Sequence, residues 1–121
     1  MLECEDLTYA VRGAIFEVSR ELGAGFLESV YENALAHELT SRGLSVQRQV
    51  PVTTFYKQVP VGQHVLDLLI EDELIVELKA VRGLLPEHEA QLLNYLKAMS
   101  YRVGLLVNFT HPKAQIKRMV L

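Results

Sequence analysis

The sequence is poor in the residues that mark several common classes of protein. It contains a single cysteine, Cys4, so an internal disulfide is excluded, and a lone thiol is typical of the reducing cytoplasm. No apolar run approaches the roughly 18 residues of a membrane-spanning helix. Residues 1–6 also lack the basic start and apolar stretch of a signal peptide. We therefore expect a cytoplasmic location and no membrane partner.

Clustered positive charge is also missing. The chain has 12 Lys and Arg against 15 Asp and Glu residues, with a net charge of −3 and a pI near 5.8. Counterion release, which drives simple electrostatic binding to nucleic acid, needs clustered basic side chains, so this mode of binding is disfavoured. An enzyme acting on nucleic acid is still allowed, because a bound Mg²⁺ ion presents local positive charge to a phosphate.

The length and the apolar content predict one domain spanning residues 1–121. Half of the 121 residues (50%) are hydrophobic, which is enough to fill a core. Apolar side chains recur at helical spacing over residues 6–22 and 27–42, and Gly23 is well placed as a left-handed cap between the two helices. A third helix is expected over residues 86–99, where Pro86 occupies the first turn.

A periodicity of two predicts strands in most of the remaining chain. The first covers residues 46–56 and ends in a turn near Lys57, and Pro51 and Pro60 indicate an edge strand or bulges. Two apolar runs, 64–70 and 74–81, predict a hairpin whose strands are largely buried on both faces. Two further strands are expected over residues 102–108 and 115–121. The order α-α-β-β-β-α-β-β predicts an α/β fold with a mixed central sheet flanked by helices.

Charged residues inside the apolar hairpin are the most informative feature of the sequence. Glu77 and Lys79 lie two apart in the second strand and therefore share one face, and Asp67 lies in the first strand. Burying a lone charge is costly, so charged groups in such strands need a reason. A surface ion pair is one explanation. A site for phosphodiester hydrolysis is the other.

The second explanation assigns a role to each charged group. Asp67 and Glu77 supply the hard oxygen ligands that Mg²⁺ or Mn²⁺ prefers, and such a metal lowers the pKa of a bound water. Lys79 orients the attacking water or offsets charge growing on the phosphate. The site requires both carboxylates on one face of the sheet. A two-residue turn would separate them, so we predict an odd connection, such as residues 71–73, or a bulge.

Two pairs of polar residues accompany this trio on the predicted helices. Glu28 and Glu32 are spaced i, i+4 beside the apolar stripe of the second helix, and like charges at this spacing are either solvated or near a cation. Gln91 and Tyr95 have the same spacing beside the leucine stripe of the third helix. They are boundary residues unless that helix borders the site.

The histidines do not form a recognisable metal site. No zinc-type spacing connects the four of them, His37, His64, His88 and His111. Two, His64 and His88, lie close in sequence to Asp67 and Gln91. Either His64 or His88 is therefore a candidate for lining the site.

With these residues in view, the sequence resembles the GxxExxY family, a small bacterial and archaeal group within the PD-(D/E)xK nuclease superfamily. The naming motif is present as Gly25, Glu28 and Tyr31 in the segment GFLESVY. The nuclease core looks like Asp67, then nine residues, then Glu77-Leu78-Lys79. The downstream blocks of the family are similar to residues 89–96 and 103–109, so the resemblance covers nearly the whole chain.

The resemblance implies a restriction-endonuclease-like core with a divalent metal at Asp67 and Glu77 and with Lys79 as the catalytic lysine. It also implies a supporting helical carboxylate, which is Glu28 or Glu32. In related exonuclease-like members a glutamine and a tyrosine close the site, and Gln91 and Tyr95 match this pair.

Three functions are therefore open at the level of the sequence. The first is a Mg²⁺-dependent (or Mn²⁺-dependent) nuclease or phosphodiesterase acting on nucleic acid, specifically DNA. The second is a catalytically weak nuclease-fold module for binding or assembly that needs a protein partner. The third is a structural homo-oligomer in which the charged residues form only an ion-pair network.

Overall fold

A computed structural model of the chain describes residues 4–110 and 112–121. Its elements, in chain order, are α1 (Glu5–Leu22), α2 (Glu28–Ser41), β1 (Val46–Tyr56), β2 (Val59–Ile70), β3 (Leu74–Lys79), α3 (Pro86–Met99), β4 (Val103–Asn108) and β5 (Gln115–Val120). The predicted element order is confirmed. Residues 1–3, which belong to the segment inspected for a signal peptide, and His111 lie outside the described residues. None of the helices in the described segments is long and apolar enough to cross a membrane.

The five strands form one mixed sheet in the order β1-β2-β3-β4-β5. Strands β3 and β4 are parallel, and the other neighbouring pairs are antiparallel. A parallel pair cannot be joined by a tight hairpin, and α3 supplies the crossover between β3 and β4. The predicted mixed sheet flanked by helices is therefore confirmed.

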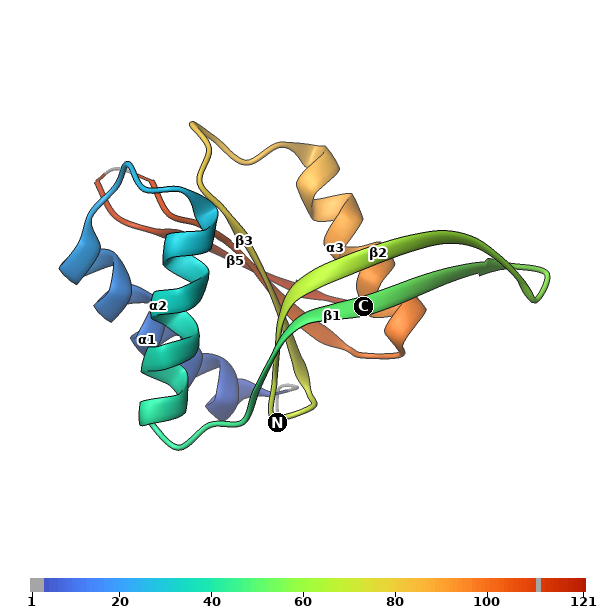
Figure 1. Cartoon of the computed structure of the whole chain (residues 1–121), viewed down its shortest axis with the longest axis horizontal. Helices are drawn as coiled ribbons and strands as arrows, with labels where there is room; N and C mark the ends of the chain where they lie inside the picture. The colour runs from blue at the N-terminus through green and yellow to red at the C-terminus, as the bar shows by residue number, and fades with distance from the viewer. Residues whose placement is uncertain (1–3, 111) are drawn as a thin grey trace.

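The helices cover both faces of the sheet (Figure 1), with α1 and α2 on one face and α3 on the other. Val76 and Leu78 of β3 pack into the core under α1 and α2, whereas Ile75 packs against α3. This alternation explains why β3 reads as a continuous apolar run, because both of its faces are buried. Glu77 and Lys79 follow Ile75 at a spacing of two, so they belong to the face that carries α3.

Helix α3 lies very close to β4 at Gly104. A Cβ atom at this position would be 2.9 Å from Cδ1 of Leu92, which is closer than side-chain packing tolerates. The missing side chain of Gly104 therefore allows Leu92 to rest directly on the strand. This contact holds the helix that carries Gln91 and Tyr95 against the sheet.

The β1–β2 hairpin is long and extends well beyond the rest of the sheet (Figure 1). Its two halves pack on different faces: Val46 joins the core under α1 and α2, whereas Val50 and Val52 join the core under α3. Between them, Gln49 has a φ of 51°, a conformation that non-glycine residues adopt only occasionally. The change of face therefore occurs at Gln49.

Two strand predictions are refined by this hairpin. β1 is an edge strand, and its register shifts between Thr54 and Phe55 opposite Pro60, which confirms the expectation of an edge or a bulge. β2 begins earlier than predicted, and its outer half is exposed because it projects past the helices. Only Leu66 and Leu68–Ile70 of β2 are fully buried, so burial on both faces was overestimated for this strand.

Gly23 ends α1, and its N–H donates to the carbonyl oxygen of Ser19. Its φ of 73° is positive, as predicted. Its ψ of −175° is extended, so Gly23 does not adopt the left-handed helical conformation that was expected.

Candidate active site

The connection between β2 and β3 sets the geometry of the site. Ile70 pairs with Leu74, so the loop has three residues, Glu71, Asp72 and Glu73. The predicted odd connection is therefore confirmed. The register continues through Leu68 opposite Val76, and one step further it places Asp67 opposite Glu77 on the same face.

Asp67 and Glu77 occupy a fork where β2 and β3 separate. The backbone N–H of Asp67 donates to Oε1 of Glu77 at 2.8 Å. In return, the backbone N–H of Leu78 donates to Oδ2 of Asp67, also at 2.8 Å. Each carboxylate thus accepts a hydrogen bond from the backbone of the opposite strand. These two bonds replace the ladder beyond Leu68 and Val76 and fix both side chains.

Burial and crowding of negative charge dominate the electrostatics of this fork. Burial raises the pKa of Glu77 to about 8, and the neighbouring Asp67 carboxylate adds to the rise. Burial also raises the pKa of Asp67. The hydrogen bond from the N–H of Leu78 lowers this pKa, whereas the charges of Glu32 and Glu28 raise it further. The charge of Lys79 favours the ionised form of both carboxylates. A divalent cation between the two carboxylates would offset this repulsion.

The donors of the fork fit a hard divalent metal ion. Mg²⁺ is commonly held by one or two carboxylates and keeps several waters, and Asp67 and Glu77 supply that donor set. Over residues 4–110 and 112–121, no group of three or more His, Cys, Asp or Glu side chains is arranged to hold a metal. A closed site made only of such side chains is therefore not formed there. The fork instead suits an ion that completes its shell with water and substrate phosphate.

Lys79 lies at the end of β3, half-buried and on the same face as Glu77. The chain that follows it is fixed by Asn108 of β4, which is opposite Lys79 in the parallel pair and fully buried. Oδ1 of Asn108 accepts from the N–H of Val81, and its Nδ2 donates to the Val81 carbonyl, each at 2.9 Å. This role of Asn108 was not predicted from the sequence. The available signal was an amide ending a strand that is otherwise apolar.

The two glutamates of α2 lie near the fork but have different surroundings. Oε2 of Glu32 accepts from Arg48 at 2.8 and 3.1 Å, and its Oε1 accepts from Nε2 of Gln49 at 2.6 Å. The same Nε2 atom lies 3.5 Å from Oδ1 of Asp67. Of the two alternatives for this pair, solvation or a nearby cation, the second holds for Glu32, because Arg48 neutralises it. Glu28 is exposed, and its charge acts on both fork carboxylates.

The tyrosine of the GFLESVY segment is structural. Tyr31 is buried, its hydroxyl donates to the Gly23 carbonyl at 2.6 Å, and it accepts from the N–H of Phe26 at 3.2 Å. Its ring stacks on Phe109 with centroids 4.3 Å apart. Gly25 in the same loop has a φ of 107°, which side chains rarely tolerate. Tyr31 therefore fixes the loop that starts α2 and places Glu28 in the first turn.

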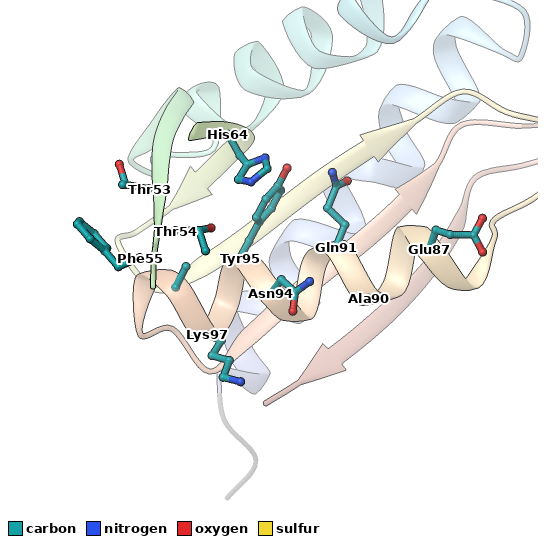
Figure 2. A pocket seen from close by; sticks show the side chains of 11 residues that line it. Thr53, Thr54, Phe55, His64, Glu87, Ala90, Gln91, Asn94, Tyr95 and Lys97 are labelled. Carbon is teal, nitrogen blue, oxygen red and sulfur yellow. The ribbon is translucent and has the colours of Figure 1, made fainter. Parts of the chain in front are cut away.

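Gln91 and Tyr95 project from one side of α3 (Figure 2). Burial raises the pKa of the Tyr95 hydroxyl, and the charges of Glu77 and Asp67 raise it further. A side-chain hydrogen bond with Gln91 lowers this pKa in part. Tyr95 therefore lies within electrostatic reach of the fork. The ring of His64 lies beside it, with centroids 5.8 Å apart. His88 has another role, because its Nδ1 accepts from the N–H of Leu85 at 3.0 Å and caps the start of α3.

A five-stranded mixed sheet with this order of elements, flanked by helices on both faces, is consistent with a restriction-endonuclease-like fold. The family model described as the PD-(D/E)XK nuclease superfamily matches residues 5–119, and the chain belongs to this superfamily. Nucleases of the superfamily generally use divalent metal ions. Membership therefore supports a nuclease-type function.

The fold is also similar to a solved structure, the crystal structure of SSO0001, with a TM-score of 0.63 at 19% sequence identity. The match covers 76% of this chain and 48% of the other, so this chain spans about half the length of that protein. At this identity the similarity concerns the fold alone. No curated protein matches the chain.

Proposed function

We propose that the protein is a nuclease of the GxxExxY type that hydrolyses phosphodiester bonds in DNA with Mg²⁺ or Mn²⁺ as cofactor. The observation that carries the proposal is the fork, where Asp67 and Glu77 are held by reciprocal 2.8 Å hydrogen bonds with the opposite strands. Lys79 lies two residues further along on the same face. Membership of the nuclease superfamily supports the same chemistry. We place this activity in the cytoplasm, as the lone cysteine predicts.

Each side chain of the site then has a proposed task. Asp67 and Glu77 would hold the metal ion, which when bound acts as a Lewis acid and lowers the pKa of a coordinated water. Glu77 gives up its proton when it becomes a ligand. Lys79 orients the attacking water and offsets charge that grows on the phosphate in the transition state.

The helical residues have supporting tasks. Glu28 is the carboxylate available as a secondary ligand or base, because Glu32 is already engaged by Arg48 and Gln49. We assign Glu32 a positioning role, since Gln49 connects it with Asp67. Gln91 and Tyr95 would position the substrate or Lys79.

The rival function is a nuclease-fold module with little activity of its own that needs a protein partner. The projecting β1–β2 hairpin favours it, because this arm carries exposed apolar residues on both of its strands: Phe55, Tyr56, Val59, Val61 and Val65. Exposed apolar side chains gathered on one arm are typical of a surface that another chain covers. A second copy of the chain would serve the same purpose.

A cleavage panel separates these functions. The chain is incubated with Mg²⁺ or Mn²⁺ and single-stranded, duplex and branched DNA, and with RNA. We compare Glu77→Gln with Glu73→Gln, which alters an exposed carboxylate of the β2–β3 loop. We expect metal-dependent cleavage of DNA that falls about 100-fold or more in Glu77→Gln and is unchanged in Glu73→Gln. Equal activity of the two variants, or no cleavage by the wild type, contradicts the nuclease proposal.

A further inference from the structure

A pocket of about 890 Å³ lies between the β1–β2 hairpin and α3, next to the candidate active site. His64 and Tyr95 point toward each other at its edge (Figure 2). Tyr95 connects the pocket with the candidate active site. It lines the pocket, and the charges of Glu77 and Asp67 raise the pKa of its hydroxyl, which burial raises most. A ligand in this pocket would therefore contact Gln91 and Tyr95, the two residues of α3 that are proposed for the active site.

The lining of the pocket offers stacking and hydrogen bonding more than charge. His64 is exposed, so its ring presents a face to a ligand. Thr54, Gln91 and Asn94 add hydroxyl and amide groups, which both donate and accept hydrogen bonds. The Lys, Arg, Asp and Glu residues that line it are Lys97 and Glu87, one of each sign.

This composition favours unpaired over paired nucleic acid. Duplex DNA is held largely by basic and polar contacts to its phosphates, and its stacked bases do not offer their faces. An unpaired strand exposes base faces that stack on aromatic rings and base edges that bond to amides. The pocket volume is also in the range of sites for small organic ligands, about 300–1,000 Å³, which suits individual nucleotides and not a double helix.

We propose that this pocket binds unpaired nucleotides of a DNA strand, with one base stacked on His64 and its edge bonded to Gln91 or Asn94. The substrates of the site would then be single-stranded DNA, or single-stranded ends and flaps of a duplex. This proposal rests on the proposed nuclease function, which places the scissile phosphate at Asp67 and Glu77. Lys97 is positioned for a phosphate contact at the far end of the pocket.

The test measures binding without cleavage. Fluorescence anisotropy follows short oligo(dT), or a duplex of the same length, binding to the full Glu77→Gln chain in Mg²⁺. We expect oligo(dT) to bind about 10-fold or more tightly than the duplex. Adding His64→Ala should weaken oligo(dT) binding by roughly 5- to 100-fold, the range for the loss of one stacking contact. Adding His64→Phe, which keeps an aromatic face, should restore most of the affinity.

The matched control is Val65→Ala, because Val65 is exposed and adjacent to His64 but points to the other face of β2 and does not line the pocket. It should change affinity by less than about twofold, within the spread of a surface substitution. With one or two phosphate contacts, the slope of log K against log salt should be roughly −0.7 to −1.4. Melting curves of each variant verify that it folds, and Asn94→Ala, on the exposed side of α3, repeats the test if His64→Ala does not fold.

Tighter binding of the duplex, or equal effects of His64→Ala and Val65→Ala, would overturn the inference. Its failure is separable from failure of the nuclease proposal. Cleavage that Glu77→Gln abolishes, without a preference for unpaired strands, removes only the pocket assignment. A preference for oligo(dT) that depends on His64, without metal-dependent cleavage by the wild type, removes only the nuclease assignment.

Discussion

The buried carboxylate of Glu77 predicts an unusual dependence of stability on pH in metal-free protein. Its pKa rises from an ordinary 4.5 to about 8 in the folded chain. Below the ordinary value, Glu77 carries its proton in both states and the folded chain has no penalty. As the pH rises, the unfolded chain loses this proton first, so stability falls until the pH passes about 8. Removing the titrating group with Glu77→Gln should therefore stabilise the protein at alkaline pH.

The magnitude follows from the shift. One pKa unit corresponds to about 1.4 kcal/mol, so a rise from 4.5 to about 8 represents at most about 5 kcal/mol, shared with the coupled Asp67 carboxylate. For a chain of this length, each kcal/mol moves the melting temperature by about 3–5 °C. We therefore expect the melting temperature of the wild type to fall by up to about 15–25 °C between acidic and alkaline pH. Glu77→Gln keeps an oxygen that accepts from the N–H of Asp67, so the fork itself should survive.

The assay is thermal unfolding in EDTA across pH 5 to 9, repeated with Mg²⁺ or Mn²⁺. Wild type and Glu73→Gln should show the same fall, and Glu77→Gln should show little of it. Metal should raise the melting temperature of the wild type most at high pH, because binding requires the deprotonated carboxylate. Identical pH profiles of the wild type and Glu77→Gln would refute the argument, since ionisation of Glu77 would then carry no cost in the folded chain.

Three further substitutions test separate parts of the site. Lys79→Met should lower nuclease activity by about 100-fold or more, yet keep the metal-dependent rise in melting temperature, because Lys79 is not a ligand. Asn108→Ala removes both partners of the Val81 backbone and should cost about 1–3 kcal/mol in urea unfolding. Gly104→Ala places a methyl group 2.9 Å from Leu92 and should also cost about 1–3 kcal/mol in the same assay.

Each substitution has its own contradicting result. A Lys79→Met chain that no longer responds to metal would make the lysine part of the metal site. The control for Asn108→Ala is Asn94→Ala, which alters an exposed amide on α3. Equal free energies of unfolding of the two variants would show that the hydrogen bonds between Asn108 and Val81 do not stabilise the fold. Gly83→Ala is the control for Gly104→Ala, because no atom lies within 4 Å of the added carbon at position 83.

Much of the site's geometry could be predicted from the sequence because strands alternate with a period of two. Once Asp67 and Glu77 were required on one face, parity alone predicted the odd β2–β3 connection. The order of elements could also be predicted, because the spacing of apolar residues changes between the helical period of about 3.6 and the strand period of about two along the chain. Gln91 and Tyr95 were boundary residues by pattern alone, and the family resemblance assigned them to the site.

The remaining features depend on contacts that no local pattern specifies. The bend in β1 rests on a positive φ at Gln49, a residue type with no marked preference for it, next to ordinary strand residues. Whether Glu32 is solvated or paired depends on where β1 crosses α2, because that crossing brings Arg48 to it. Asn108 ends an apolar strand, and only the path of the chain through Val81 reveals its hydrogen bonds.

One local distortion serves both the fork and the pocket. In a regular sheet the backbone donors at Asp67 and Leu78 would both bond to carbonyls of neighbouring strands. The bend at Gln49 carries the outer half of the hairpin toward α3, so β2 leaves β3 at Asp67 and these donors become available to carboxylates. The same departure carries His64 to Tyr95 and builds the outer wall of the pocket. The strained residue Gln49 therefore couples the placement of the two proposed metal ligands to the surface that would receive the strand.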